Sequence, residues 1–111
     1  MPTTVTQQQE RWDEIARDPT LRDLSYKIET NERGQLLLSP HKNEHSFTQT
    51  TLLDVLKEHA PSGRRAPEFA IATPKGTKSP DVVWMSDTRW RNMEETGDPT
   101  TIAPEICIEV M

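Results

Sequence analysis

The sequence predicts an α+β domain in which helices pack against a mixed β-sheet. Two features favour this class. Short apolar runs rich in β-branched residues alternate with stretches whose apolar residues recur at helical spacing. These segments follow the order helix, hairpin, helix and then three strands, which is typical of α+β domains. The 111 residues suffice for one small domain, so we expect a single domain over residues 1–111.

The first predicted helix begins near Thr6 and ends before Pro19. Thr6 and Gln9 have the spacing of a capping box, and Trp12 follows at helical spacing. Asp18 ends the helix, because a residue that precedes proline is disfavoured in the helical conformation.

A β-hairpin is predicted next, from two extended runs. Their apolar residues are Tyr26, Ile28, Leu36 and Leu38. The connection, residues 31–34, ends at Gly34, which is placed for a positive φ. Ser39-Pro40 ends the second strand.

A longer helix is predicted from Asn43, a good N-cap residue, to about His59, and Glu44 in its first turn suits the helix dipole. Its inward-facing residues are expected to be Phe47, Leu52, Val55, Leu56 and His59. Strands are predicted over residues 69–73, 80–85 and 105–110, with a helical turn around Trp90 and Met93.

Composition excludes several classes of protein. Hydrophobic content is 32% and mean hydropathy is −0.77, so the core must be thin. We find no apolar run of membrane-spanning length and no signal peptide, so we expect a cytoplasmic protein without a membrane partner. A single cysteine, Cys107, excludes an internal disulfide and is expected to be a buried, inert thiol. There is no glycine-rich phosphate loop and no Gly-x-Ser-x-Gly motif.

The net charge of −5 is unevenly distributed. Residues 1–56 carry 6 basic and 9 acidic side chains, residues 57–91 carry 7 and 4, and residues 92–111 carry none and 5. The central segment, with a net charge of +3, is either a phosphate-binding rim or an ordinary solvated surface. Its basic residues are Lys57, Arg64, Arg65, Lys75, Lys78, Arg89 and Arg91.

Two acidic residues, Asp81 and Glu109, lie in apolar runs that are predicted to be strands. A buried carboxylate requires hydrogen bonds, a cation or a metal, and two of them on neighbouring strands would form a divalent-metal site of the kind that nucleases use. The alternatives are that Asp81 caps a local backbone group and that Glu109 faces solvent. The second follows from a strand alternation that puts residues 106, 108 and 110 on the opposite face.

The histidines and tryptophans give weaker signals. His41, His45 and His59 lack a ligand spacing on one helix, so no zinc site is predicted, although His45 could contact phosphate or substrate. Trp84 and Trp90 could stack on nucleic-acid bases, but core packing for Trp84 and a loop clamp for Trp90 are the favoured interpretations.

An ordered set of motifs resembles the PD-(D/E)XK nuclease superfamily, and within it the Uma-type branch of restriction endonucleases. The resemblance covers nearly the whole chain from about residue 10. The matching segments are Tyr26-Lys27-Ile28-Glu29, Gly34, Leu36-Leu37-Leu38-Ser39-Pro40, His45, Gly76, Pro80-Asp81-Val82-Val83-Trp84, Arg89-Trp90 and Ala103-Pro104-Glu105-Ile106-Cys107-Ile108-Glu109-Val110.

This resemblance implies a restriction-endonuclease-like sheet packed by helices and a Mg²⁺- or Mn²⁺-dependent DNA endonuclease. Asp81 and Glu109 would be catalytic metal ligands, and the Val110 carbonyl would be a further ligand. Glu29 matches an early acid of the family that orients a water or a second metal. DNA would be bound through its phosphate backbone. The alternative functions are a catalytically inactive binding or regulatory module and a non-functional fragment.

The sequence departs from the family at its end. The signature lysine position, two residues after Glu109, is Met111, and the final helix and strand of the family are missing, so we expect a truncated domain. Without a lysine at the site, hydrolysis by this chain is expected to be poor or absent. Residues 105–111 are expected to expose a sheet edge, through which the chain could form a homodimer.

Overall fold

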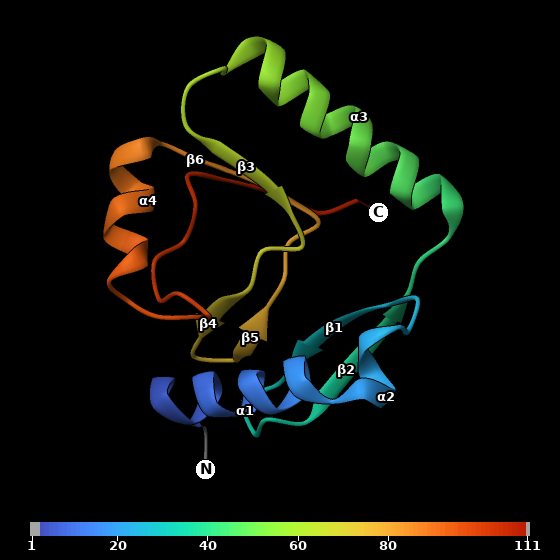
Figure 1. The fold of residues 1–111 in the computed structure, drawn as a ribbon, viewed down its shortest axis with the longest axis vertical. Helices are drawn as coiled ribbons and strands as arrows, with labels where there is room; N and C mark the ends of the chain where they lie inside the picture. The colour runs from blue at the N-terminus through green and yellow to red at the C-terminus, as the bar shows by residue number, and fades with distance from the viewer. Residues whose placement is uncertain (1–2, 111) are drawn as a thin grey trace.

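The computed structural model describes residues 3–110 as four helices and seven strands, which confirms the predicted α+β class. None of the described helices combines the length and the apolar character that crossing a bilayer requires. The described chain is flat, with principal extents of 42, 33 and 23 Å. Figure 1 shows its broad face. The elements are α1 Val5–Arg17, α2 Pro19–Arg22, β1 Tyr26–Thr30, β2 Leu36–Pro40, α3 Asn43–His59, β3 Arg64–Pro67, β4 Ile71–Thr73, β5 Gly76–Lys78, β6 Val82–Met85, α4 Asp87–Glu94 and β7 Ile106–Ile108.

The strands form three small antiparallel sheets, where we expected one mixed sheet. β1 pairs with β2, β4 pairs with β5, and β6 lies between β3 and β7. A parallel bridge joins Ile71 and Thr100. Pro67 and Pro80 lie where the sheets separate, and neither has an N–H with which to continue a ladder. The strands predicted at 69–73 and 80–85 are the shorter β4 and β6, and β3 and β5 were not predicted.

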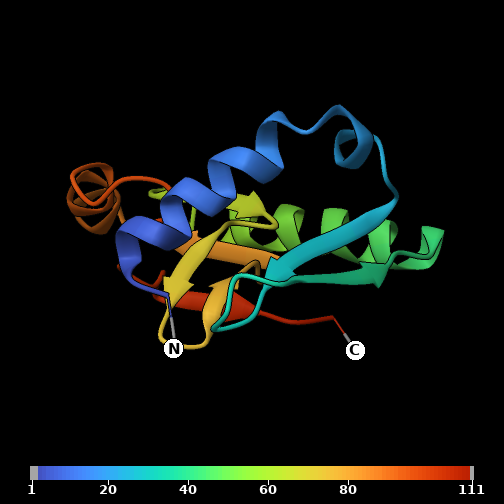
Figure 2. The same ribbon diagram turned by 90° about the horizontal axis from the view of Figure 1, so that it is seen from below.

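Helix α1 begins slightly earlier than predicted. Thr4 is its N-cap, and reciprocal hydrogen bonds between Thr4 and Gln7 form the capping box. The expected pair, Thr6 and Gln9, lies inside the helix. Helix α1 packs against the β4–β5 hairpin (Figure 2). The buried Gln8 docks it there, because its side-chain amide makes hydrogen bonds of 2.7 and 3.2 Å to the two strands.

The apolar core is small, as the composition predicts. Its buried members are Val83, Met85 and Met93, each no more than 1% exposed. Burying such a side chain contributes about 1.5–3 kcal/mol. Strand β6, the middle strand of its sheet, supplies two of the three. The indole N–H of Trp84 donates to carbonyls of the loop that follows α3. Partly buried residues around this core are Ala66, Phe69, Trp90 and Ile102.

Helix α3 has the predicted extent, but its expected inward stripe is confirmed only in part. Leu52 and Leu56 are half-buried, whereas Phe47 is 74% exposed and Val55 and His59 are also exposed. Asn43 is the first helical residue and not the N-cap.

The half-buried face of α3 also carries His45 and Gln49. The Gln49 side chain donates a hydrogen bond of 3.2 Å to the carbonyl of Asp81, just before β6. This polar contact shares the inward face with apolar residues, which apolar spacing did not predict.

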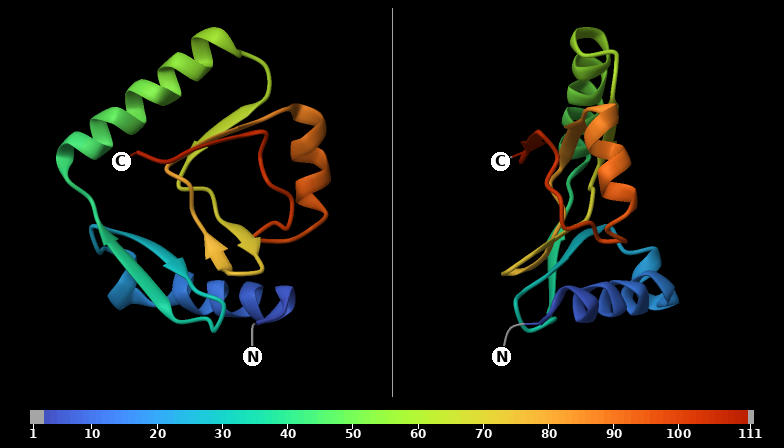
Figure 3. Two further views of the ribbon diagram at one scale, coloured as in Figure 1. Left: turned by 180° about the vertical axis from the view of Figure 1, so that it is seen from behind. Right: turned by 90° about the vertical axis from the view of Figure 1, so that its left-hand side faces the viewer.

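Strand β7 forms one edge of the three-stranded sheet (Figure 3). Cys107 is exposed there, so the prediction of a buried thiol is wrong, because an edge strand has a neighbour on one side alone. Ile106 is 38% exposed on the same strand. Dimerisation through this edge stays a prediction, since the structure describes one copy of the chain.

Candidate functional site

Asp81, which immediately precedes β6, is a buried carboxylate with 1% exposure. Its Oδ2 accepts a hydrogen bond of 2.7 Å from the N–H of Val110, and its Oδ1 lies 3.2 Å from the Nζ of Lys27. The carbonyl of Asp81 accepts hydrogen bonds from the N–H of Glu68 and from Gln49. The carboxylate therefore joins segments distant in sequence, and the alternative of a local backbone cap is wrong.

Lys27 brings to this site a cation that the sequence analysis missed. It lies on β1 with 8% exposure, and its Nζ is 2.9 Å from Glu109 Oε2. A third carboxylate, that of Glu29, is 4.0 Å from the same nitrogen. The expectation that the chain cannot place a lysine here is therefore wrong. Strand alternation puts residues 27 and 29 on one face, and the apolar residues that identified this strand, Tyr26 and Ile28, lie on the other.

The ammonium and the buried carboxylate stabilise each other in their charged forms. Burial lowers the pKa of Lys27, but its hydrogen bonds to Glu109 and Asp81 outweigh burial, so that the pKa is raised. Burial also raises the pKa of Asp81, but the N–H of Val110 and the Lys27 ammonium outweigh it, and the net pKa is lowered. The two groups form a charged pair at neutral pH.

The predicted glutamates lie around this pair. Glu109 follows β7, and its side chain is 54% exposed while it bonds Lys27. The solvent-facing alternative is therefore right about exposure but omits the ion pair. Glu29 accepts a hydrogen bond of 2.7 Å from the N–H of Ser79, which helps to hold the turn before Asp81. Val110, predicted to contribute its carbonyl, contacts Asp81 through its N–H.

Two histidines lie beside Asp81, although we predicted no ligand spacing among the histidines. The Nε2 atom of His45 is 3.3 Å from Asp81 Oδ1, and the ring of His41 stacks on that of His45 with centroids 4.5 Å apart. His41 Nε2 lies 3.1 Å from Glu68 Oε1. The two histidines are four residues apart, but His41 precedes α3, so a search within one helix misses it. His59 is exposed at the other end of α3.

An open cavity of about 420 Å³ adjoins the site. It lies between the first turns of α3 and the segment after β7. Because His45 and Val110 both contact Asp81, this cavity gives a ligand access to the surroundings of that carboxylate. Its lining residues are Pro40, Lys42, Glu44, His45, Thr48 and Val110.

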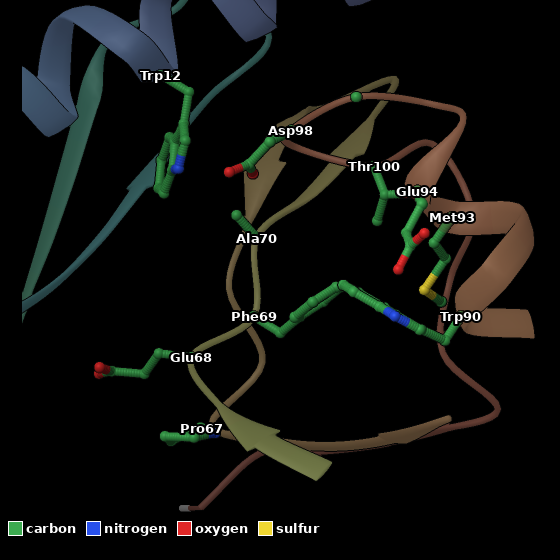
Figure 4. Close-up of a pocket in the computed structure, with 11 residues that line it drawn as sticks. Trp12, Pro67, Glu68, Phe69, Ala70, Trp90, Met93, Glu94, Asp98 and Thr100 are labelled. Carbon is green, nitrogen blue, oxygen red and sulfur yellow. The ribbon is translucent and has the colours of Figure 1, made fainter. Parts of the chain in front are cut away.

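A second pocket, of about 360 Å³, lies beside α4 and has an aromatic wall (Figure 4). Trp12, Phe69 and Trp90 contribute to it, and the Trp90 ring packs edge-on against Phe69 with centroids 6.3 Å apart. Glu94 and Asp98 also line the pocket, and such carboxylates repel a phosphate backbone. Trp90 is therefore packed within the domain and is a poor platform for bases.

Several residues of the predicted basic rim make internal contacts. The guanidinium of Arg64 lies 4.7 Å from the centroid of the Trp90 ring. Arg89 forms an ion pair of 3.2 Å with Glu105, and Lys78 donates to a carbonyl at the end of β1. These three cations have structural roles, so the rim stays a prediction for the remaining ones.

No curated protein matches the chain. A family model, Uma2, described as "Putative restriction endonuclease", matches residues 8–111. The match includes the segments that supply Lys27, Asp81 and Glu109, and it confirms the resemblance drawn from the sequence motifs. The chain therefore belongs to the Uma2 family of restriction-endonuclease-like proteins.

Proposed function

We propose that this domain hydrolyses phosphodiester bonds of DNA as a Mg²⁺- or Mn²⁺-dependent endonuclease. The observation that carries the proposal is the convergence of Asp81 and Glu109 on the Nζ of Lys27. Membership of the Uma2 family supports a nuclease-like activity. DNA is the proposed partner, bound through its phosphate backbone.

The donor atoms suit a hard divalent cation. Mg²⁺ and Mn²⁺ prefer carboxylate and carbonyl oxygens, and Asp81 and Glu109 each direct one oxygen to within 3.2 Å of the same positive charge. These two side chains would hold the metal, and the Val110 carbonyl and Glu29 are the further proposed contributors. When bound, such a metal supplies a Lewis acid and a water of lowered pKa.

Lys27 is assigned the part of the lysine that the sequence analysis found missing. Its raised pKa keeps the ammonium protonated at neutral pH, so it acts as a fixed positive charge and not as a base. We assign it to a non-bridging oxygen of the scissile phosphate. There it stabilises the negative charge that develops as a water oxygen bonds to phosphorus and the leaving oxygen departs.

A second candidate is a module that binds without hydrolysis. Lys27 neutralises Asp81 and Glu109 in the described structure, and a buried ion pair of this kind can be structural alone. The domain would then recognise a partner without taking up a metal at these carboxylates.

Metal titration combined with plasmid cleavage separates the two candidates. Calorimetry with Mg²⁺ and Mn²⁺ compares the wild-type chain, Asp81→Asn and a control, Glu58→Gln, which removes an exposed carboxylate of α3. We expect the wild type and the control to bind metal and to cut supercoiled plasmid, and Asp81→Asn to lose both properties. Cleavage that survives in EDTA or in Asp81→Asn refutes the hydrolase. DNA binding without metal uptake supports the second candidate.

A further inference from the structure

The histidine pair next to Asp81 has no part in the proposed hydrolysis. His41, directly after β2, and His45, in the first turn of α3, stack with an angle of 17° between their rings. Each side chain is more than four-fifths buried, with exposures of 17% and 18%. Stacked imidazoles beside buried and half-exposed carboxylates are an arrangement that needs a chemical explanation.

The polar atoms of this cluster are close enough to share one ion. One nitrogen from each of His41 and His45 and one oxygen of Asp81 all lie within 4.8 Å of one another. Both Nε2 atoms are buried without a hydrogen-bond partner among the described residues, although each lies near a carboxylate. Since a buried polar atom without a partner is costly, these nitrogens are available to a ligand.

The backbone also brings the carboxylate of Glu68 to the histidine pair. Glu68 has a φ of +49°, a conformation that a residue with a side chain rarely adopts. Its N–H donates to the carbonyl of Asp81, and its own carbonyl accepts a hydrogen bond of 3.0 Å from Ser79 Oγ. These contacts fix the segment that brings the Glu68 carboxylate to 3.1 Å from His41.

The charge of the cluster favours a cation. Asp81 and Glu68 contact the histidines, and the neighbouring Glu29 and Glu109 add negative charge, while Lys27 is the positive group that contacts Asp81. These four carboxylates outnumber the one ammonium. A divalent ion would offset this excess at short range.

We propose that His41, His45 and Asp81 form a binding site for a divalent transition metal, with Zn²⁺ as the representative ion. Imidazole nitrogen is a good ligand for Zn²⁺, Co²⁺ and Ni²⁺, whereas Mg²⁺ prefers oxygen. Two histidines and one carboxylate make three protein ligands, which is the usual number in zinc sites that keep one position open. The Glu68 carboxylate, which lies 3.1 Å from His41 Nε2, adds negative charge beside the ion.

This site is distinct in composition from the proposed Mg²⁺ site, with which it shares Asp81 but not Glu109. It goes beyond the proposed function, because it requires no cleavage of DNA. The adjoining cavity, which His45 lines, offers the route by which an ion enters.

Zn²⁺ calorimetry on the full chain tests the site, with His41→Ala, His45→Ala and the control His59→Ala. His59 lies on α3 as His45 does, but it is exposed at the far end. Losing a residue that contacts a metal ligand, and not the metal itself, costs about 10–100-fold in metal affinity. His41 and His45 are proposed as direct ligands, so each of the first two variants should weaken Zn²⁺ binding by more than about 100-fold. The control should bind as the wild type does. Equal affinity in all variants, or an equal loss in His59→Ala, overturns the proposal.

Paramagnetic Co²⁺ provides a second measurement that requires no variant. In NMR spectra of the wild-type chain, Co²⁺ should shift the imidazole signals of His41 and His45 at one equivalent and leave those of His59 in place. Signals that move together for all three histidines, or for none, refute the site. Cleavage of plasmid with Mg²⁺ is measured in parallel, so that loss of the nuclease proposal and loss of the zinc site are separate results.

Discussion

Replacing Lys27 by methionine removes the cation that faces the buried carboxylate of Asp81. The side chains of both residues are less than 10% exposed, so the pair is screened little by water. Removing one partner of a buried pair costs about 3–5 kcal/mol, because the remaining charge stays desolvated. Glu109 is 54% exposed, and its contact with Lys27 adds at most about 1 kcal/mol.

We expect Lys27→Met to lower the free energy of unfolding by about 3 kcal/mol, near the lower limit of that range, because the N–H of Val110 still bonds Asp81. At roughly 4 °C per kcal/mol, the melting temperature should fall by about 12 °C. Urea unfolding followed by circular dichroism measures the change. Lys57→Met, an exposed lysine of α3, is the matched control. The double variant Lys27→Met/Asp81→Asn should be more stable than Lys27→Met alone, since it buries no unpaired charge.

The same variant separates a catalytic lysine from a structural one. Without the ammonium, Asp81 and Glu109 have no competing cation, so Mg²⁺ should bind more tightly while plasmid cleavage is lost. A purely structural lysine would weaken metal binding and cleavage together with the fold. If Lys27→Met unfolds at the same urea concentration as Lys57→Met, the ion pair makes no such contribution and the reasoning from burial is refuted.

Three further outcomes follow from the fold. Thr4→Ala should lower stability by about 1 kcal/mol in urea unfolding and Thr6→Ala should not, because Thr4 is the N-cap of α1. Gly76→Ala should cost more than about 1 kcal/mol by the same measurement, since Gly76 has a φ of +107° and a Cβ there would clash with the carbonyl of Thr30 in β1. The hydrogen bond from the N–H of Ser86 is the main cause of the lowered pKa of Glu105. Its stabilisation is therefore present above the ordinary pKa of 4.5 and lost as pH falls through the lowered value. Glu105→Gln should flatten that part of the stability–pH curve, and an unchanged curve contradicts the assignment.

The β1–β2 hairpin was predictable because its determinants are local. Asn31 accepts hydrogen bonds from the N–H groups of Arg33 and Gln35, and Gly34 supplies a φ of +77°. Which face of β1 turns toward the interior was not predictable in the same way. Alternation specifies two faces of a strand but not which one turns inward. In β1 the buried residues are Lys27 and Thr30, and the apolar Tyr26 lies exposed on the face opposite to Lys27.

Asp81 itself could be identified as a site residue from the sequence, but the residues that contact it could not. Its Pro-Asp motif and the apolar strand after it were visible, because both are short-range features. Its partners come from β1, from α3 and from the segment after β7, and a sequence does not state which of these segments meet. A buried carboxylate needs compensation from every side, so each contact it makes identifies a residue that spacing alone could not. Lys27 and His45 are both residues of this kind, and they meet the same Oδ1 atom. Three cations compete for Asp81 Oδ1: the Lys27 ammonium, a metal held by the histidines and a metal held with Glu109. The function that we propose for the domain depends on which of them occupies that oxygen.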